Sequence, residues 1–286
     1  MKGSRRLLIN ADDFGLHASI NEAVAKACRN GILRSASLCV NGDAFEEAAA
    51  IAKENRQLGV GIHLTLNGEK PAASREAIPS LLDEHGYLME SHGRLFRRIL
   101  DGGVRMEQIA LECRAQIERF LGRGLVPTHL DGHRHVHLFP PVFRLLKTIL
   151  AEYRIQKIRW LRVPVRDFWT GARLPHIAFL ILLLGTSRLL KGTGLRHPDR
   201  FLGYFNSDRL DARYFTRILE RLPPGVTEIA LHPGTDDRRL AKHYRSWSER
   251  HDWHGNWEEQ FRLLMDKDVA DRIAAGGISL IHYGQV

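Results

Sequence analysis

Short apolar segments alternate with segments of helical periodicity along the chain, and this alternation constrains the fold more than any other feature. A strand is expected at residues 7–11, followed by a helix at residues 20–29 whose apolar residues share one face. Strands that alternate with helices form a parallel sheet with helical crossovers. Further strands are expected at 35–40, 59–66, 126–130, 155–163, 228–231 and 278–282, and helices at 44–54, 106–121, 142–151, 210–222 and 269–275.

This pattern predicts an α/β fold whose sheet is either open or closed into a barrel. We expect residues 1–286 to form one domain, because α/β barrels of this length fold as a unit. Residues 67–100 and 164–210 lack a clear period, so they are expected to be irregular excursions that set substrate specificity. The second excursion is expected to be an insertion in the domain.

The three cysteines, Cys28, Cys39 and Cys113, are scattered and odd in number. Their spacing predicts neither a disulfide framework nor a cysteine metal site. We expect no secretory signal, because the apolar run after the first basic residues is short and meets two acids at once. We therefore expect a reducing, cytoplasmic setting.

The formal net charge of +9 is concentrated in one part of the chain. Residues 154–221 contain fourteen Lys or Arg and five Asp or Glu, which accounts for the whole excess. A localised basic region favours an acidic partner, either phospholipid headgroups or nucleic acid. A solvated face without a partner is the alternative.

An apolar run lies inside the basic region. Residues 174–187 contain no charged side chain apart from one histidine, and the run is shorter than the about 20 residues that a membrane-spanning helix needs. It could be a buried core helix, a contact in a homo-oligomer, or a segment in the membrane interface at the inner face of the cytoplasmic membrane. In the last case the expected lipid contacts are Phe179, Leu180, Leu183, Leu184 and Arg188.

Polar residues with catalytic chemistry follow several of the expected strands. Asp12 and Asp13 come directly after the first strand, where two carboxylates are costly to bury unless they are paired or bound to a metal. Neighbours on a strand point to opposite sides, so one carboxylate can ligate a metal while the other acts as a base. Alternatively, one of them caps the next helix.

The strongest cluster is at residues 129–137, where four histidines and Asp131 fall within nine residues beside a strand end. Neutral imidazole is a common metal ligand, and an acceptor such as Asp131 typically fixes its tautomer. A catalytic site keeps about three protein ligands, so not all four histidines can bind the ion. His63 and His232 also lie at strand ends, although each alone is as easily a core histidine.

Four blocks of the sequence together resemble the YdjC-like carbohydrate deacetylases, also called the ChbG/HpnK family. The blocks are Asn10-Ala-Asp-Asp-Phe-Gly-Leu16, Gly61-Ile-His-Leu64, Thr128-His-Leu-Asp-Gly-His-Arg-His-Val-His137 and Leu231-His-Pro-Gly234. They occur in the family's order and extend from the first strand to the final third of the chain. The resemblance implies a distorted (β/α) TIM-like barrel of the polysaccharide-deacetylase type.

The resemblance also implies roles for individual residues. Asp13, His63 and His133 would hold one divalent metal ion, Zn²⁺ or Mg²⁺. Asp12 would be the general base and His232 the general acid in hydrolysis of an N-acetyl group, chemistry to which a metal-activated water is suited. The residues expected behind the ligands or against the substrate are Asp131, Arg134, His135 and His137, and His137 could instead be a ligand.

Residues 194–201, after the apolar run, resemble the family branch associated with hopanoid biosynthesis. That resemblance implies a lipid-linked substrate, an N-acetylglucosaminyl hopanoid, which would explain the apolar run and the basic region together. The chitooligosaccharide branch, with diacetylchitobiose as substrate, needs neither feature.

Two other classes of function use some of the same features. A metal-dependent phosphoesterase also has Asp and His clusters, but it often uses two metals, and few bridging carboxylates are evident here. A nucleic-acid-binding module would use the basic region alone and would leave the strand-end clusters without a role. We therefore expect an enzyme with no nucleic-acid partner.

Overall fold

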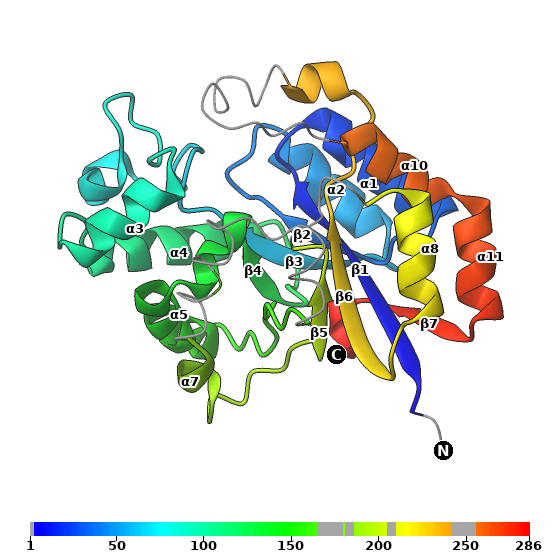
Figure 1. Cartoon of the computed structure of the whole chain (residues 1–286). Helices are drawn as coiled ribbons and strands as arrows, with labels where there is room; N and C mark the ends of the chain where they lie inside the picture. Colours follow the sequence, from blue (N-terminus) through cyan, green and yellow to red (C-terminus); the bar gives the residue numbers. More distant parts are fainter. Residues whose placement is uncertain (1–2, 165–179, 181–185, 205–209, 242–255) are drawn as a thin grey trace.

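Seven parallel strands form a curled sheet with helices around its outside (Figure 1). The computed structural model describes residues 3–164, 180, 186–204, 210–241 and 256–286. The order of strands is β4-β3-β2-β1-β6-β5, and β7 also pairs with β1. The strands are β1 (Arg5–Phe14), β2 (Ser35–Leu38), β3 (Gly59–Leu64), β4 (Leu130–Gly132), β5 (Arg200–Leu202), β6 (Gly225–Leu231) and β7 (Ile278–Ile281).

Strand β1 organises the sheet because it has three partners. Its first residues, from Arg5 to Leu8, pair with β7, and its last residues, from Asn10 to Phe14, pair with β2. Strand β6 lies along its other edge (Figure 1). Side chains on both faces of β1 are buried from Leu7 onward, as is typical of a parallel sheet covered by helices.

Helices surround this sheet, and several of them pack directly against its strands. Helix α4 has the expected bounds, and α1, α2, α5, α8 and α11 begin and end within two or three residues of their expected positions. The helices are α1 (Ala18–Asn30), α2 (Phe45–Glu54), α3 (His92–Leu100), α4 (Met106–Leu121), α5 (Pro140–Glu152), α7 (Thr186–Leu190), α8 (Ala212–Glu220), α10 (Trp257–Met265) and α11 (Lys267–Ala275), with short 3-10 helices η1 (Arg75–Ala77), η2 (Pro79–Leu81), η3 (His133–Leu138) and η6 (Tyr283–Gln285).

The strand expected at residues 155–163 is wrong as a regular strand. This segment makes only single bridges, from Ile158 to Leu130 and from Lys157 to Arg196. Its backbone nevertheless bonds on two sides: Leu130 N donates to Lys157 O at 3.0 Å, and Phe201 N donates to Arg162 O at 3.1 Å. The segment therefore links β4 to β5 and curls the sheet toward a barrel, which confirms the predicted fold class.

Other boundaries also differ from the expectation. The strand expected at 126–130 begins only at Leu130. Val126 is 85% exposed, so this apolar residue does not belong to a buried strand as the sequence pattern predicted. Strand β1 continues to Phe14, which places Asp12 and Asp13 inside the strand instead of after it. The two expected excursions contain regular elements, α3 in the first and β5 in the second.

The apolar run at 174–187 lies mostly outside the described residues, and so do Phe179, Leu183 and Leu184. Of the expected lipid contacts, Leu180 is buried and Arg188 is exposed. Among the helices that the structure describes, none combines the length and the apolar character needed to cross a bilayer.

Candidate metal centre and active site

The polar residues singled out in the sequence gather at the carboxyl ends of neighbouring strands. Asp13 lies near the end of β1, His63 on β3 and Asp131 on β4, and His232 follows β6 directly. His63 and Asp131 are register partners across the β3–β4 pair. Asp13, His63 and Asp131 each expose 2% or less of their surface. The parallel sheet therefore places these side chains at one edge, as the strand-end pattern predicted.

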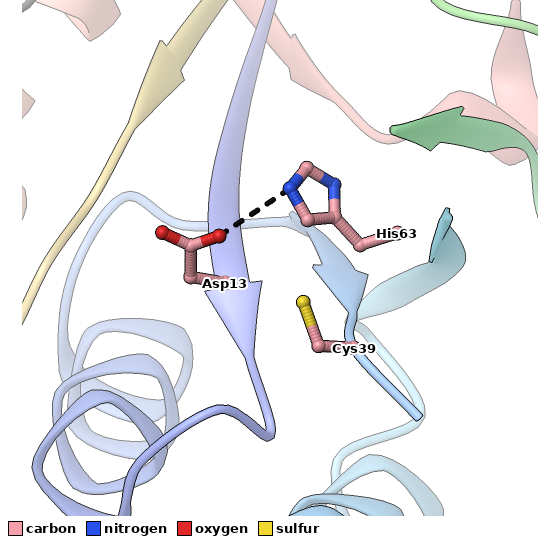
Figure 2. A group of neighbouring side chains, drawn as sticks. All are labelled: Asp13, Cys39 and His63. Carbon is pink, nitrogen blue, oxygen red and sulfur yellow. Dashed lines mark ion pairs between the residues drawn. The ribbon is translucent and has the colours of Figure 1, made fainter. Parts of the chain in front are cut away.

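Asp13 is the centre of the candidate metal cluster. Its Oδ1 lies 2.9 Å from Nδ1 of His133 and 3.4 Å from Nε2 of His63 (Figure 2). The other ring nitrogen of His63, Nδ1, lies 2.7 Å from Oδ1 of Asp131. A carboxylate behind the distal nitrogen is typical of a metal-ligating histidine, because it fixes the tautomer and the ring orientation. Carboxylate and imidazole donors fit Zn²⁺ as well as a harder divalent ion.

Unusual backbone conformations position the cluster. Asp13 has a φ of 63°, in the left-handed region, at the point where the β1–β2 register shifts. Arg134 and His135, with φ values of 51° and 58°, turn the chain sharply after His133. Such values are uncommon for residues other than glycine and cost about 1–2 kcal/mol each. Three of them near one cluster indicate that the surrounding packing holds these residues in place.

Electrostatics at the cluster follow from burial among opposite charges. Burial lowers the pKa of His63, but the negative charge of Asp131 and hydrogen bonds to Asp13 and Asp131 outweigh it and raise that pKa to about 10. Burial would raise the pKa of Asp13, yet His133 and His63 hold it well below its usual range. In the metal-free protein a protonated His63 therefore bridges two carboxylates, and a divalent cation can take over the role of that proton.

A buried arginine binds several carboxylates next to the candidate metal cluster. Arg159 is fully buried, and its Nη1 and Nη2 donate to the two carboxylate oxygens of Asp12 at 2.6 and 2.7 Å. Nη1 also lies 2.8 Å from Oδ2 of Asp131, and Nε donates to Oε1 of Glu228 at 2.7 Å. Tyr283 Oη donates to the other Glu228 oxygen at 2.5 Å. One guanidinium thus orients three carboxylates, two of which belong to the predicted site.

Sequence reasoning missed Arg159, Glu228 and Tyr283. A signal for Arg159 was present, since it is a charged residue in the middle of a segment expected to be a buried strand. A buried charge requires partners, so this position pointed to carboxylates elsewhere in the chain. Glu228 lies on β6 and Tyr283 follows β7, and nothing local in the sequence links either of them to Arg159.

The remaining predicted residues lie around the cluster. His232 is half-buried, its backbone N donates to Oε1 of Gln260 at 2.6 Å, and its charge helps to lower the pKa of Asp13. His137 donates from Nε2 to the carbonyl oxygen of Arg159 at 3.1 Å. His135 packs against Phe201 and Tyr204, and a nitrogen of Arg134 lies 3.4 Å from His92. These contacts of His135, His137 and Arg134 are made outside the group formed by Asp13, His63 and His133.

A further buried carboxyl, that of Glu69, lies on the segment that follows β3. Glu69 is 8% exposed, and its buried Oε1 has no hydrogen-bond partner among the residues that the structure describes. Burial raises the pKa of Glu69 to about 8, and the negative charges of Asp43 and Asp13 add to this effect while Lys70 opposes it. Glu69 therefore carries a proton at neutral pH in the folded protein.

The stability of the metal-free protein should fall as the pH rises from about 4.5 to 8, because the folded state then holds a proton on Glu69 that the unfolded chain has released. Replacing Glu69 with Gln should flatten this fall and raise the free energy of unfolding at pH 9 by on the order of 2 kcal/mol. Urea unfolding at pH 5, 7 and 9 in chelator measures the effect. The exposed Glu84→Gln is the control, and equal pH profiles for wild type and Glu69→Gln would contradict the assignment.

An α/β sheet curled toward a barrel, with buried Asp and His side chains at the carboxyl ends of its strands, is the arrangement in which enzymes with (β/α) barrels carry their active sites. The chain matches the model of the YdjC-like protein family over residues 6–275. It belongs to that family.

Relatives of known description agree with this membership. The chain is 32% identical over 282 residues to a carbohydrate deacetylase of Geobacillus stearothermophilus, covering 98% of this chain and 97% of the relative. It is 38% identical over 242 residues to a chitooligosaccharide deacetylase of Escherichia fergusonii, covering 83% and 85%. A crystal structure from Enterococcus faecalis V583, of a protein with a suggested role in cellobiose-phosphate cleavage, superposes with a TM-score of 0.73 at 25% identity and covers 99% of this chain and 98% of that one.

Proposed function

We propose that this chain is a metal-dependent carbohydrate deacetylase that hydrolyses the N-acetyl group of an N-acetylglucosamine unit. The observation that carries the proposal is the buried group of Asp13, His63 and His133 at the strand ends, with Asp131 behind His63. Relatives named carbohydrate and chitooligosaccharide deacetylases, which match four-fifths or more of the chain, support the same reaction.

Asp13, His63 and His133 would hold one divalent ion, Zn²⁺ or Mg²⁺. When bound, such an ion polarises the acetyl carbonyl and makes a water molecule a better nucleophile at neutral pH. Asp131 keeps His63 in the orientation that turns Nε2 toward Asp13. Ser37 holds Asp131 in turn, donating to its Oδ2 at 2.8 Å.

Asp12 is the proposed general base that takes the proton of the attacking water. Its carboxylate is oriented by both terminal nitrogens of Arg159 and by Asn10, whose Nδ2 donates to Oδ1 at 2.7 Å. The three donors fix the direction from which Asp12 can accept a proton. His232, on the loop after β6, is the proposed acid that gives a proton to the sugar nitrogen as the C–N bond breaks. The products are then acetate and the free amine.

The finer proposal is that the acetylated sugar is lipid-linked, as in an N-acetylglucosaminyl hopanoid. The basic region at residues 154–221 and the apolar run inside it support contact with the inner face of the cytoplasmic membrane. A soluble chitooligosaccharide is the alternative, and the name of the Escherichia fergusonii relative favours it.

Acetate release by the purified, metal-loaded chain tests the proposal. We would offer diacetylchitobiose in buffer and N-acetylglucosaminyl hopanoid in detergent, each with and without chelator, and assay phosphate release from a sugar phosphate in parallel. We expect chelator-sensitive acetate from at least one acetylated sugar. Acetate from the hopanoid would support the lipid-linked substrate. Acetate from diacetylchitobiose alone would contradict the proposal of a lipid-linked substrate.

Two variants sharpen this experiment. Asp13→Asn should release no acetate above background, because the amide cannot replace a carboxylate ligand. Asp101→Asn, a change just after α3 and distant in sequence from every strand end, should keep the native rate. No acetate from a folded, metal-loaded wild type, or phosphate as the only product, would overturn the proposed function.

A further inference from the structure

A cysteine thiol shares the buried space between two of the proposed metal ligands. Sγ of Cys39, a carboxylate oxygen of Asp13 and a ring nitrogen of His63 all lie within 4.8 Å of one another. All three side chains are buried, Cys39 being 1% exposed. In Figure 2 the Cys39 sulfur points to the space between the Asp13 carboxylate and the His63 ring.

The fold places this thiol by contacts with two strands. Cys39 follows β2 directly, and its backbone N donates to the carbonyl oxygen of Phe14 at 2.7 Å, next to Asp13. On the other side, Oγ1 of Thr65 donates to Sγ at 3.7 Å, just after β3. The side chain of Gln116 holds the backbone of Thr65 in place. Thr65 N donates to Oε1 of Gln116 at 2.9 Å, and Nε2 of Gln116 donates to the carbonyl oxygen of Thr65. The position of Sγ is therefore defined from the β1, β2 and β3 sides.

The chemistry of these three donors is that of a site for a borderline or soft divalent ion. A tetrahedral Zn²⁺ binds sulfur at about 2.3 Å and nitrogen or oxygen at about 2.0–2.2 Å. Ligand atoms around such an ion lie roughly 3.5 Å apart, so the present separations, which are within 4.8 Å, would need to contract by about 1.3 Å at most. Thiolate selects Zn²⁺ over Mg²⁺, because Mg²⁺ prefers oxygen donors.

A role in apolar packing alone explains the position less well. The Cys39 sulfur accepts a hydrogen bond from Thr65 and faces a carboxylate and an imidazole. A bound cation would replace the thiol proton, which leaves for solvent as the metal–sulfur bond forms.

We propose that Cys39 is a direct ligand of the metal ion at this site, together with Asp13 and His63, and that it makes the site selective for Zn²⁺ over Mg²⁺. The inference rests on the proposed function in one respect, since both require a metal at Asp13 and His63. It differs from it in assigning the Cys39 sulfur, in place of the His133 nitrogen, as the third protein donor, so a catalytic ion would still have a position open for water. The spacing of the cysteines in the sequence does not indicate this donor.

Substitution with Co²⁺ tests the sulfur bond directly, because a thiolate bound to Co²⁺ gives a sulfur-to-metal charge-transfer absorption in the near ultraviolet. The full-length chain, stripped of metal and titrated with Co²⁺, should show this band together with the visible bands of bound Co²⁺. Cys39→Ser should keep the visible bands and lose the charge-transfer band. Cys113→Ser, which removes a buried cysteine on α4, is the matched control and should keep both.

Competition between ions provides the second readout. Cys39→Ser should weaken Zn²⁺ binding at least tenfold, equivalent to about 1.4 kcal/mol, and leave Mg²⁺ binding unchanged. Cys39→Ala serves the same test if the serine variant does not fold, with thermal unfolding in chelator as the check on folding.

The outcomes separate this inference from the proposed function. Visible bands without a charge-transfer band in wild type, or a charge-transfer band that survives in Cys39→Ser, would overturn the role of Cys39 and leave the metal site standing. Absence of any bound Co²⁺ or Zn²⁺ in the folded protein would overturn both. Acetate release remains a separate measurement of the reaction.

Discussion

Replacing His63 with Gln should lower kcat/KM for deacetylation by about 1000-fold or more and weaken the binding of the divalent ion. The change removes the nitrogen that faces Asp13 while keeping a side chain of similar volume. A bound ion supplies several kcal/mol of stabilisation to the transition state, and each 1.36 kcal/mol corresponds to a factor of ten in rate. Acetate release and isothermal titration with Zn²⁺ measure the two effects.

The control for this variant is another buried histidine from the same region. His129 lies on the segment entering β4, where its ring stacks on Tyr283 and its Nε2 is 3.0 Å from Ser37 Oγ. His129→Gln should keep native affinity for the metal even if it lowers stability. Loss of Zn²⁺ binding in His129→Gln with retention in His63→Gln would show that the cluster around Asp13 is not the metal centre.

Replacing Arg159 with Leu should lower the free energy of unfolding by about 3–5 kcal/mol. The variant leaves three buried carboxylates, those of Asp12, Asp131 and Glu228, without their shared cation, and breaking a buried ion pair from one side carries a cost of this size. Burial raises the pKa of Glu228 to about 7 even with Arg159 present. In the variant, Glu228 should therefore take up a proton readily once the charge of Arg159 is removed. Urea unfolding in chelator measures the change.

Two comparisons make this result specific. Arg159→Lys keeps the charge but cannot form the fork with Asp12, so it should lose less stability than Arg159→Leu while still lowering turnover. Arg114→Leu removes a partly exposed pair with Glu152 and should cost less than about 1 kcal/mol. Equal losses for Arg159→Leu and Arg114→Leu would contradict the view that Arg159 is the centre of the buried network.

The parts of the fold that sequence predicted are those where neighbouring residues determine the structure. Helices α1, α2, α4 and α5 show a helical period over ten or more residues, and the strands β1, β2, β3, β6 and β7 each contain buried apolar residues. The segment at 155–163 also contains several apolar residues, but its backbone partners change from β4 to β5 along its length. No local pattern distinguishes such a segment from a regular strand.

The same limit applies to the candidate site. Asp13, His63 and His133 could be found because each lies at a strand end within a recognisable block. Arg159 could not be assigned, because its partners come from β1, β4 and β6, and these meet only in the folded chain. Cys39 was set aside because cysteine spacing detects only ligands that are close together in the sequence, whereas its neighbours Asp13 and His63 lie on other strands.

The pairing of β7 with the first residues of β1 has a consequence for the order in which the molecule can assemble. Tyr283, which follows β7, is fully buried among Leu8, Val226 and Ile281 and donates to Glu228. The hydrogen-bond network that holds Asp12 is therefore complete only after β7 has paired with β1, and these strands are far apart in the sequence. Contacts of such large separation slow folding, since the loop between them must be closed first. In a nascent chain that has formed β1 through β6 but not β7, Glu228 would still lack Tyr283. The buried network that holds the proposed catalytic carboxylate, Asp12, would then remain accessible to water.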